Sequence, residues 1–588
     1  MDIFNVFTML GGLALFLYGM HIMGDGLAKL SGGKLERILE NLTSTPIKAV
    51  LLGAGVTAVI QSSSATTVMV VGFVNSGIMK LAQAAPIIMG ANIGTTMTSW
   101  ILSLSGIESS NFFISLLKPS SFSPILAMIG VILFMFNKKE KNKDLGLILI
   151  GFSILMTGME TMSGAMQPLK DSESFKQIFT MFSNPILGML AGAILTAVIQ
   201  SSSASIGILQ ALCASGNVYY SAALPIIMGQ NIGTCVTALI SGIGASKNAK
   251  RASLVHLYFN VIGTVIFMVV FYSVNAFVDF AFLGEAANVA GIAMIHSIFN
   301  VVATVVLLPF VKQLEKLAYL TIKEDEVEEK VEDNEFKLLD PRFLDTPAFA
   351  IKQCKELTVK MAGLAREALF HAMTLVNEDY QEEVAEKVNA IESRVDHYED
   401  ELGSYLIKLS SKNLSEKDSC TLSMLLHCIG EFERISDHAV NIMEAGKEMH
   451  EKGLDFSEKA REELSIFTRA VQDVVNITMQ VFEQEDTKLA VTVEPLEEVV
   501  DYLNAEVKAR HIKRLTKGTC TIELGFVLSD ITTNYERVAD HCSNVAVCLI
   551  QLENKGFDTH EYIEMIKSEE NVAFKEKYKA YKKQYILP

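Results

Sequence analysis

Charged residues are scarce in the first half of this chain. Residues 1–310 contain 15 Lys+Arg and 12 Asp+Glu, whereas residues 311–588 contain 35 and 55, so the two parts carry net charges of +3 and −20. No charged residue occurs from Ala49 to Met79 or from Gln177 to Ser246. This contrast predicts a membrane half followed by a soluble half. The overall acidity argues against nucleic acid as a partner.

The sequence also lacks the marks of a disulfide framework and of common enzymes. Its eight cysteines form no CxxC pair, and six of them lie in the second half, which fits reduced thiols in a cytoplasmic domain. No P-loop, HExxH motif or nucleophile–base pattern occurs, so the sequence does not favour an enzyme. The N-terminal MDIFNVFTML has no basic region, and we expect a retained membrane helix there.

Two copies of one polar stretch interrupt the apolar half. TAVIQSSSAT (Thr57–Thr66) is repeated as TAVIQSSSAS (Thr196–Ser205), a step of 139 positions. The same step carries PIIMGANIGT (Pro86–Thr95) onto PIIMGQNIGT (Pro225–Thr234), and the shared register continues beyond both motifs. Repeats of this size in a membrane protein indicate a transporter whose site lies where the two halves meet.

Each polar stretch is expected to break a helix. Ala49–Met79 is charge-free but contains Gln61 and three serines in its middle, so a re-entrant helical hairpin that faces protein or water is more natural than one span. Gly90 and Gly94, around Asn92, predict a second break. The expected spans are Phe4–Met23, Ala82–Ser105, Phe122–Phe136, Leu145–Met162, Ala222–Gly244, Leu254–Phe277 and Ala287–Phe310, with polar connectors at Leu27–Ser44 and Pro168–Phe182 and a second hairpin around Gln200–Ser205.

The basic loops predict how these spans are oriented. NKKEKNK (Asn137–Lys143) and KNAKR (Lys247–Arg251) are expected to be cytoplasmic. The counterpart of KNAKR in the first repeat, residues 108–112, reads ESSNF and contains no base, so it is expected outside. The repeats would then have opposite orientations. Facing hairpins in such an inverted repeat build a midplane site with alternating access.

The chemistry of the hairpins suits an oxyanion and a small hard cation. Each QSSS stretch offers amide and hydroxyl donors, and a broken helix adds backbone N–H groups at the start of its second arm. The freed carbonyls, with Ser, Thr and Asn oxygens, suit sodium. No Lys or Arg lies in either hairpin, so co-bound cations would balance the anion. The competing interpretation is that the serines only allow close helix packing and that Asn92 and Asn231 cap helix breaks.

These paired motifs resemble the sodium/phosphate cotransporter family of the type II kind, over roughly residues 1–310. Membership would imply sodium-dependent transport of inorganic phosphate, with both QSSS regions lining the phosphate site. The repeats differ in one hydroxyl, because Thr67 corresponds to Ile206. The resemblance implies phosphate contacts for Gln61, Ser62, Ser63, Ser64, Gln200, Ser201, Ser202 and Ser203, and weaker sodium or phosphate contacts for Thr66, Asn92, Thr95, Ser205, Asn231 and Thr234.

A smaller repeat occurs late in the membrane half. HLYFN (His256–Asn260) and HSIFN (His296–Asn300) each place a histidine and an asparagine at i and i+4, on one helix face. Bonds to neighbouring helices or to the hairpins would suit these residues. A structural role is the favoured interpretation for the histidines.

The second half is predicted to be helical and is also duplicated. ERISDHAVNI (Glu433–Ile442) matches ERVADHCSNV (Glu536–Val545) at a step of 103 positions. Glu-x-x-x-Asp places two acids on one helix face, which in a bundle can converge on divalent metal ions, although such pairs are also common on solvated faces. These segments resemble the PhoU family, whose domain is two three-helix bundles with acidic metal motifs. The resemblance implies metal ligands at Glu392, Asp396, Glu433, Asp437, Glu497, Asp501, Glu536 and Asp540.

The sequence therefore predicts an all-α protein with a polytopic membrane part of two inverted repeats and a cytoplasmic PhoU-like domain. The expected domains are repeat 1 (1–144), repeat 2 with two further spans (145–310), an acidic linker (311–344) and the helical domain (345–588). The expected function is sodium-coupled phosphate transport across the cell membrane, in contact with membrane lipid. Phosphate export, transport of another oxyanion, and a membrane-anchored phosphate sensor stay as alternatives. The oligomeric state is left open.

Overall fold

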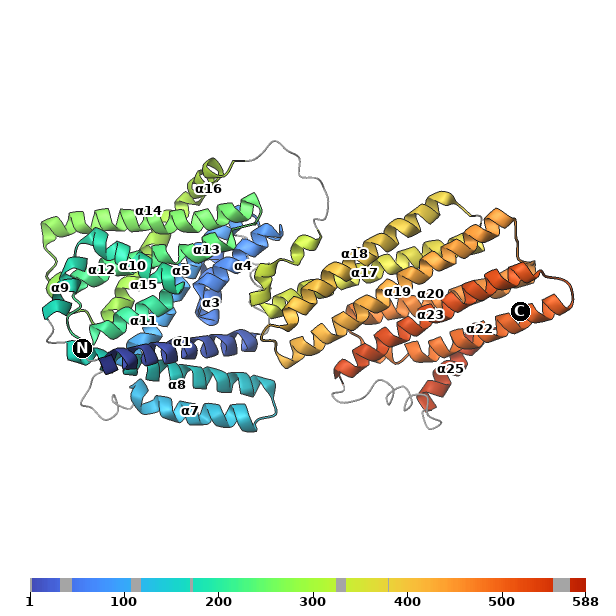
Figure 1. Cartoon of the computed structure of the whole chain (residues 1–588), viewed down its shortest axis with the longest axis horizontal. Coiled ribbons are helices and arrows are strands. Elements are labelled where there is room, and N and C mark those ends of the chain that lie inside the picture. The colour runs from blue at the N-terminus through green and yellow to red at the C-terminus, as the bar shows by residue number, and fades with distance from the viewer. Residues whose placement is uncertain are drawn as a thin grey trace. The chain divides into compact units, whose positions relative to one another are not determined.

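The computed structural model describes residues 3–31, 45–106, 118–169, 173–323, 335–378, 380–553 and 572–588. Within these ranges the chain is helical and forms no strand, so the all-α prediction is confirmed (Figure 1). The chain divides into two compact units, residues 1–349 (unit 1) and 350–588 (unit 2). Residues 324–334 of the acidic linker, the loop at 108–112 and the Leu27–Ser44 connector beyond Ser31 lie outside the described residues.

Unit 1 holds the apolar helices. Six of its described helical segments are long and apolar enough to cross a membrane: Ile3–Leu30, Leu81–Gly106, Glu140–Met166, Tyr220–Ser241, Lys247–Val278 and Val289–Thr321. Its helices are α1 (Ile3–Ser31), α3 (Pro46–Ile60), α4 (Ser63–Asn75), α5 (Leu81–Ser103), α7 (Pro119–Phe136), α8 (Glu140–Met166), α9 (Glu173–Phe182), α10 (Pro185–Ile199), α11 (Ser202–Cys213), α12 (Tyr220–Gly233), α13 (Cys235–Ser241), α14 (Lys247–Val278), α15 (Val289–Leu307) and α16 (Val311–Thr321).

Both QSSS stretches break a helix, as the sequence predicts. Helices α3 and α4 form the first hairpin, and α10 and α11 form the second; they are blue and green, respectively, in Figure 1. The arms are 15, 13, 15 and 12 residues long. Because a helix needs about 20 residues to cross the hydrocarbon, each arm is too short to span a membrane alone.

The predicted break around Asn92 is wrong, because α5 runs without interruption from Leu81 to Ser103. The glycines on α5 allow a close helix crossing instead. A Cβ atom at Gly90 would overlap the backbone carbonyl of Val50 on α3. Repeat 2 crosses in the same way, since a Cβ at Gly229 would overlap the carbonyl of Met189 on α10. The corresponding helix of repeat 2 is divided at Thr234 into α12 and α13.

Unit 2 consists of long amphipathic helices. Acidic residues in the first turns of α18 and α19 favour helix starts, and Gly453 ends α19 in the left-handed conformation. Leu, Val, Ile and Ala dominate the buried faces. The helices are α17 (Pro347–Asn377), whose first residues belong to unit 1, α18 (Glu382–Ser410), α19 (Glu416–Lys452), α20 (Glu458–Gln484), α21 (Thr487–Ala490), α22 (Val493–Thr516), α23 (Ile522–Glu553) and α25 (Val572–Gln584).

Candidate functional site

The turns of the two hairpins have nearly the same backbone. Gln61 ends α3 with φ 59° and ψ 21°, and Gln200 ends α10 with φ 58° and ψ 23°. These left-handed values are uncommon for a residue with a side chain. The next residue caps the second arm, because Ser62 Oγ accepts from Ala65 N, and Ser201 Oγ accepts from the corresponding amide in repeat 2. A glutamine and its following serine thus build the turn in both repeats.

The two turns lie next to each other. Ser64 Oγ donates to the backbone oxygen of Gln200 across 3.5 Å, which joins residues 136 positions apart in the chain. The bond is weak at that distance, but it places the start of α4 against the end of α10. Ser63, Ser202 and Ser203 are buried beside the turns. The structure therefore brings the two predicted QSSS stretches together.

In repeat 1, polar side chains near the turn hold one another in three hydrogen-bonded pairs. One pair fixes the amide of the turn glutamine, one joins the two arms of the hairpin, and one joins α5 to α14. All six residues are buried. The pairs are Thr98 Oγ1 to Gln61 Oε1 (2.8 Å), Thr57 Oγ1 to Thr66 Oγ1 (3.0 Å) and Asn92 Nδ2 to Asn260 Oδ1 (2.7 Å).

The corresponding side-chain atoms of repeat 2 form no such pairs among the described residues. The Gln200 side chain is exposed, whereas Gln61 is only 8% exposed. In the counterparts of the other paired residues, one buried side-chain polar atom each finds no hydrogen-bond partner among the residues that the structure describes. These unpaired atoms are Thr196 Oγ1, Ser205 Oγ, Thr237 Oγ1, Asn231 Nδ2 and, in the second His-x-x-x-Asn motif, Asn300 Oδ1. Repeat 2 thus keeps several buried oxygens available for a ligand.

Two of the weaker candidates bond back to their own helices. Thr95 Oγ1 donates to Ala91 O (3.1 Å), and Thr234 Oγ1 donates to Asn231 O (2.6 Å). Such bonds are common for threonine in membrane helices and need no ligand. A structural role within their own helices therefore suits Thr95 and Thr234 better than a transport site does.

Several polar residues of this region are not among the site residues that the sequence predicts. Thr57 and Thr196 begin the two QSSS motifs, and Thr98 and Thr237 share the same repeat register, so the 139-residue step contained the signal. Gln230 had no such signal, because its counterpart in repeat 1 is an alanine. Its Nε2 donates to Ser205 O (3.0 Å), which ties α12 to α11.

The electrostatics of the turns favour an anion that arrives with cations. The N-terminal ends of α4 and α11 both begin at the turns, and each helix end carries a partial positive charge and free N–H groups. No Lys or Arg belongs to either hairpin beyond Lys48 at the start of α3. The hydroxyl and amide groups can donate to a tetrahedral oxyanion, and the unpaired oxygens of repeat 2 can coordinate a small cation.

The carboxylates of unit 2 form two groups. On α22 and α23, oxygens of Glu497, Asp501 and Asp540 lie within 4.8 Å of one another, an all-oxygen set that fits a hard divalent cation. On α18 and α19, burial and the neighbouring Asp437 raise the pKa of Glu433 to about 7, with smaller effects from Glu399 and Asp396. Crowded carboxylates of this kind favour a proton or a cation.

Two of the predicted metal ligands have other neighbours. Asn504 Nδ2 donates to Glu536, which engages this carboxylate within the bundle. Glu392 on α18 accepts from the adjacent Ser393 (3.3 Å). Glu399, which the Glu-x-x-x-Asp pattern does not include, lies near enough to raise the pKa of Glu433.

Comparison with known families agrees with this division of the chain. The family described as Na+/Pi-cotransporter matches residues 15–164 and 155–297, which covers both QSSS repeats. The PhoU domain matches residues 358–446 and 464–549, so it too occurs twice. These matches fall in unit 1 and unit 2, respectively.

Similar proteins occur in bacteria and mammals. A protein of Escherichia coli named "Putative inorganic phosphate export protein YjbB" is 26% identical over 567 residues, which span 94% of this chain and 99% of that protein. The Bacillus subtilis protein YqeW, uncharacterized, is 30% identical over 45% of this chain and 82% of its own. The rat sodium-dependent phosphate transport protein 2A is 38% identical over 99 residues, 16% of this chain and 15% of that protein. With its two hairpins matched by one family and its helical unit by another, this chain belongs to the Na+/Pi-cotransporter family and carries a PhoU domain.

Proposed function

We propose that this protein transports inorganic phosphate across the cytoplasmic membrane together with sodium, with unit 2 on the cytoplasmic side. The observation that carries the proposal is the meeting of the two QSSS turns, where Ser64 of one hairpin reaches Gln200 of the other. Two helix N-termini and six serine hydroxyls gather there. Phosphate is a tetrahedral oxyanion that such donors satisfy.

The phosphate site consists of Gln61, Gln200 and the serines that follow each of them. Ser62 and Ser201 cap the helices, which leaves the buried Ser63, Ser202 and Ser203 to donate to the anion. The exposed side chain of Gln200 can close over phosphate, while that of Gln61 is held by Thr98.

Sodium binds the buried oxygens of repeat 2 in this proposal. Thr196 Oγ1, Ser205 Oγ and Thr237 Oγ1 are hydroxyls without a partner among the described residues. An unpaired buried hydroxyl costs about 1–3 kcal/mol, so a cation that these oxygens coordinate is stabilised by their pairing. A bound cation also offsets phosphate charge, which makes the two ions bind better together than apart.

The different hydrogen bonding of the two repeats supports alternating access in this proposal. The polar pairs are formed in repeat 1 and open in repeat 2, although the residues are nearly the same. An inverted repeat can exchange these two arrangements, so that the site opens to one side of the membrane and then to the other. The two states would differ by which repeat has its pairs formed.

Phosphate export is the second candidate, and the name of the full-length Escherichia coli relative favours it. The sign of the sodium gradient separates the candidates. A symporter follows the inward sodium gradient and therefore accumulates phosphate inside the cell. Net export would require weak sodium coupling or a cytoplasmic phosphate concentration large enough to overcome the gradient.

In unit 2, we propose a divalent cation held by Glu497, Asp501 and Asp540, whose oxygens already lie close together. Carboxylates of this kind repel one another, and a cation such as Mg²⁺ or Mn²⁺ would neutralise them. The cation would stabilise the packing of α22 against α23.

The test is uptake of radiolabelled phosphate into proteoliposomes that contain the full chain, with sodium outside, inside, or on both sides. Sodium-coupled transport predicts uptake only with sodium outside, and efflux from preloaded vesicles only with sodium inside. Equal rates under all three conditions would contradict sodium coupling while leaving phosphate transport intact. No phosphate movement under any condition would contradict the transport function. A membrane-anchored sensor would then be the better interpretation.

A further inference from the structure

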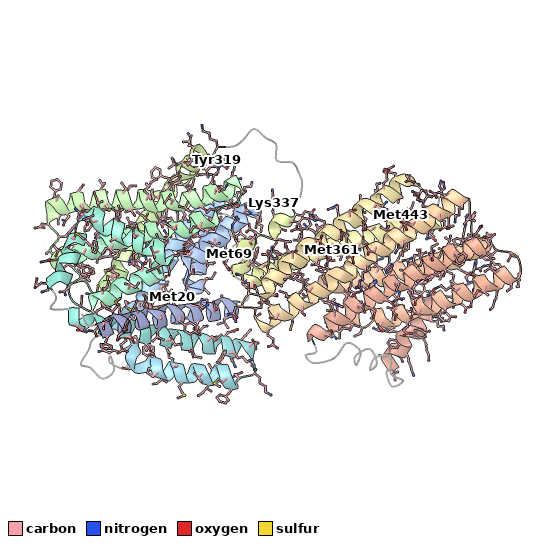
Figure 2. The ribbon with its side chains drawn as sticks, in the orientation of Figure 1. Met20, Met69, Tyr319, Lys337, Met361 and Met443 are labelled. Carbon is pink, nitrogen blue, oxygen red and sulfur yellow. The ribbon has the colours of Figure 1, made fainter. Side chains whose placement is uncertain are left out.

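The segment before unit 2 is packed into unit 1. Phe343 and Phe349 form a buried cluster with Phe73 of α4, with ring centroids 4.8 to 5.4 Å apart. All three side chains have 1% or less of their surface exposed. Residues 336–349, here called the latch segment, thus insert two aromatic rings against the second arm of hairpin 1. Figure 2 labels Met69, one turn before Phe73, and Lys337, near the start of the latch segment.

Polar contacts fasten the same segment to both repeats. Asp340, which is 4% exposed, accepts from Asn75 at the end of α4 (2.6 Å) and from Arg342 (2.8 Å). Arg342 Nε in turn donates to Ser241 O at the end of α13 in repeat 2 (2.9 Å). Asn75 also accepts from Ser246 N, just before α14 (2.8 Å). The latch segment therefore bridges hairpin 1 and the α13–α14 connection.

Hairpin 2 (α10 and α11) lacks the residues that hold the latch segment on hairpin 1 (α3 and α4). Gly72 leaves room for the Phe343 ring, because a Cβ atom there would come within 2.7 Å of Phe343 Cε1. The 139-residue step carries Gly72, Phe73 and Asn75 onto Ala211, Leu212 and Ala214, which lack the space, the ring and the amide. Hairpin 2 therefore cannot hold the segment in the same way, so the contact is a specific feature of hairpin 1.

The contact has a mechanical consequence, which rests on the proposed transport function. Alternating access requires the repeats to shift relative to each other. A buried bridge from α4 to the α13–α14 connection opposes such a shift. The bridge ends at Phe349, and the next residue, Ala350, is the first of unit 2, on the same helix α17. A rotation or pull of α17 thus acts directly on the Phe343–Phe349 cluster.

We propose that the latch segment is an autoinhibitory element. When docked, it holds hairpin 1 against repeat 2 and slows transport. When unit 2 changes its state, α17 withdraws Phe349 and Phe343, and the hairpin becomes free to move.

The first experiment measures docking without transport, by limited trypsin digestion of the full chain in detergent. Lys337 is exposed, whereas Arg342 is bonded in the bridge, so wild-type protein should be cut after Lys337 well before Arg342. Gly72→Ala should speed cleavage after Arg342 about tenfold, because overpacking favours the undocked state and proteolysis reports its population. Equal cleavage at the two sites in wild type would overturn the docking.

Gly72→Ala has matched controls. Gly55→Ala makes the same change on α3, where an added Cβ meets nothing within 4 Å, and it should leave cleavage unchanged. Alanine already occupies the corresponding position 211 of repeat 2, so the helix itself tolerates the substitution. Phe343→Ala undocks the segment from the other partner and should give the same cleavage pattern.

The second experiment measures phosphate flux in proteoliposomes for the same variants. Autoinhibition predicts that Gly72→Ala and Phe343→Ala raise the flux roughly threefold, as expected when a restrained state loses population, and that Gly55→Ala does not. Faster cleavage with unchanged or lower flux would show a purely structural contact and overturn the proposal. No flux in any variant would overturn the transport function and, with it, autoinhibition, while the cleavage pattern would still report docking.

Discussion

The turns of the two hairpins of unit 1 are almost identical in sequence and backbone, yet their side chains have different partners. The turn glutamines differ in φ by one degree. Gln61 is bonded to Thr98, whereas the corresponding Thr237 has no partner among the described residues, and Gln200 is exposed. Because the same residue types are present in both, composition does not explain the difference. The difference is one of conformation, which is what a transporter with two exchanging halves requires.

We expect the largest effect from the glycines at the two helix crossings, a feature that both repeats share. Gly90→Ala and Gly229→Ala each place a methyl group onto a backbone carbonyl of the crossing helix, and neither backbone can retreat without separating α3 from α5 or α10 from α12. Both variants should lose the monodisperse peak in size-exclusion chromatography. Gly55→Ala, with open space around it, should behave like wild type. A normal profile for only one glycine variant would mean that the two crossings are not equivalent.

Removal of one serine from each turn should have the next largest effect. Ser63→Ala and Ser202→Ala delete buried hydroxyls that do not cap a helix. A hydrogen bond to a charged ligand contributes about 1.5–3 kcal/mol, so phosphate uptake at limiting concentration should fall about tenfold or more in each variant. Wild-type uptake by Ser202→Ala, with loss only in Ser63→Ala, would restrict the phosphate site to one repeat.

Thr98 is hydrogen-bonded and its counterpart Thr237 finds no partner within the described part of the chain, so the same substitution should change stability differently at the two positions. Thr98→Val leaves Gln61 Oε1 without its donor and should lower the stability of unit 1 by about 1 kcal/mol. Thr237→Val removes a hydroxyl that has no partner among the described residues, and stability should stay equal or rise. The chain has a single tryptophan, Trp100 on α5, so thermal unfolding followed by its fluorescence reports on unit 1. Equal destabilisation by both variants would contradict the asymmetry.

The smallest expected effect concerns the carboxylates of unit 2, first the cluster around Glu433 on α18 and α19. Burial and Asp437 raise the pKa of Glu433 to about 7, so its folded form retains a proton that the unfolded chain releases near pH 4.5. Its contribution to stability therefore falls as pH rises from about 4.5 to about 7 and stays low above that. Glu433→Gln should raise the melting temperature of unit 2 by a few degrees at pH 8 and have little effect at pH 4.5, as measured by calorimetry of the full chain.

The second cluster of carboxylates, on α22 and α23, is tested by cation binding. Mg²⁺ at pH 8 should raise the melting temperature of unit 2, and Asp540→Asn should reduce that increase because it removes one of the three clustered carboxylates. An equal increase in Asp540→Asn and wild type would exclude this group as the cation site.

The sequence predicts the repeats, the positions of both helix breaks and the gathering of the QSSS turns, because a periodic duplication and a polar interruption are local properties. It fails at Gly90 and Gly94, since glycine serves equally well to end a helix and to let another helix approach. It also cannot say that Gln61 is bonded and Gln200 is not, because the same letters occur in both repeats. The partners of Glu536 and Asp340 depend on residues 32 and 265 positions away, which no pattern indicates.

The left-handed backbone of the two turn glutamines predicts which substitution would accumulate if the protein were selected for stability alone. Glycine adopts a φ near 59° freely, whereas glutamine pays about 1 kcal/mol for it. A library screened for heat resistance alone should therefore enrich glycine at position 200, where the glutamine side chain is exposed, more than at position 61, where Thr98 bonds the side chain. The selected variants would keep the hairpin but lose the amide that closes on phosphate. Selection for stability alone would therefore produce a more stable protein with impaired transport.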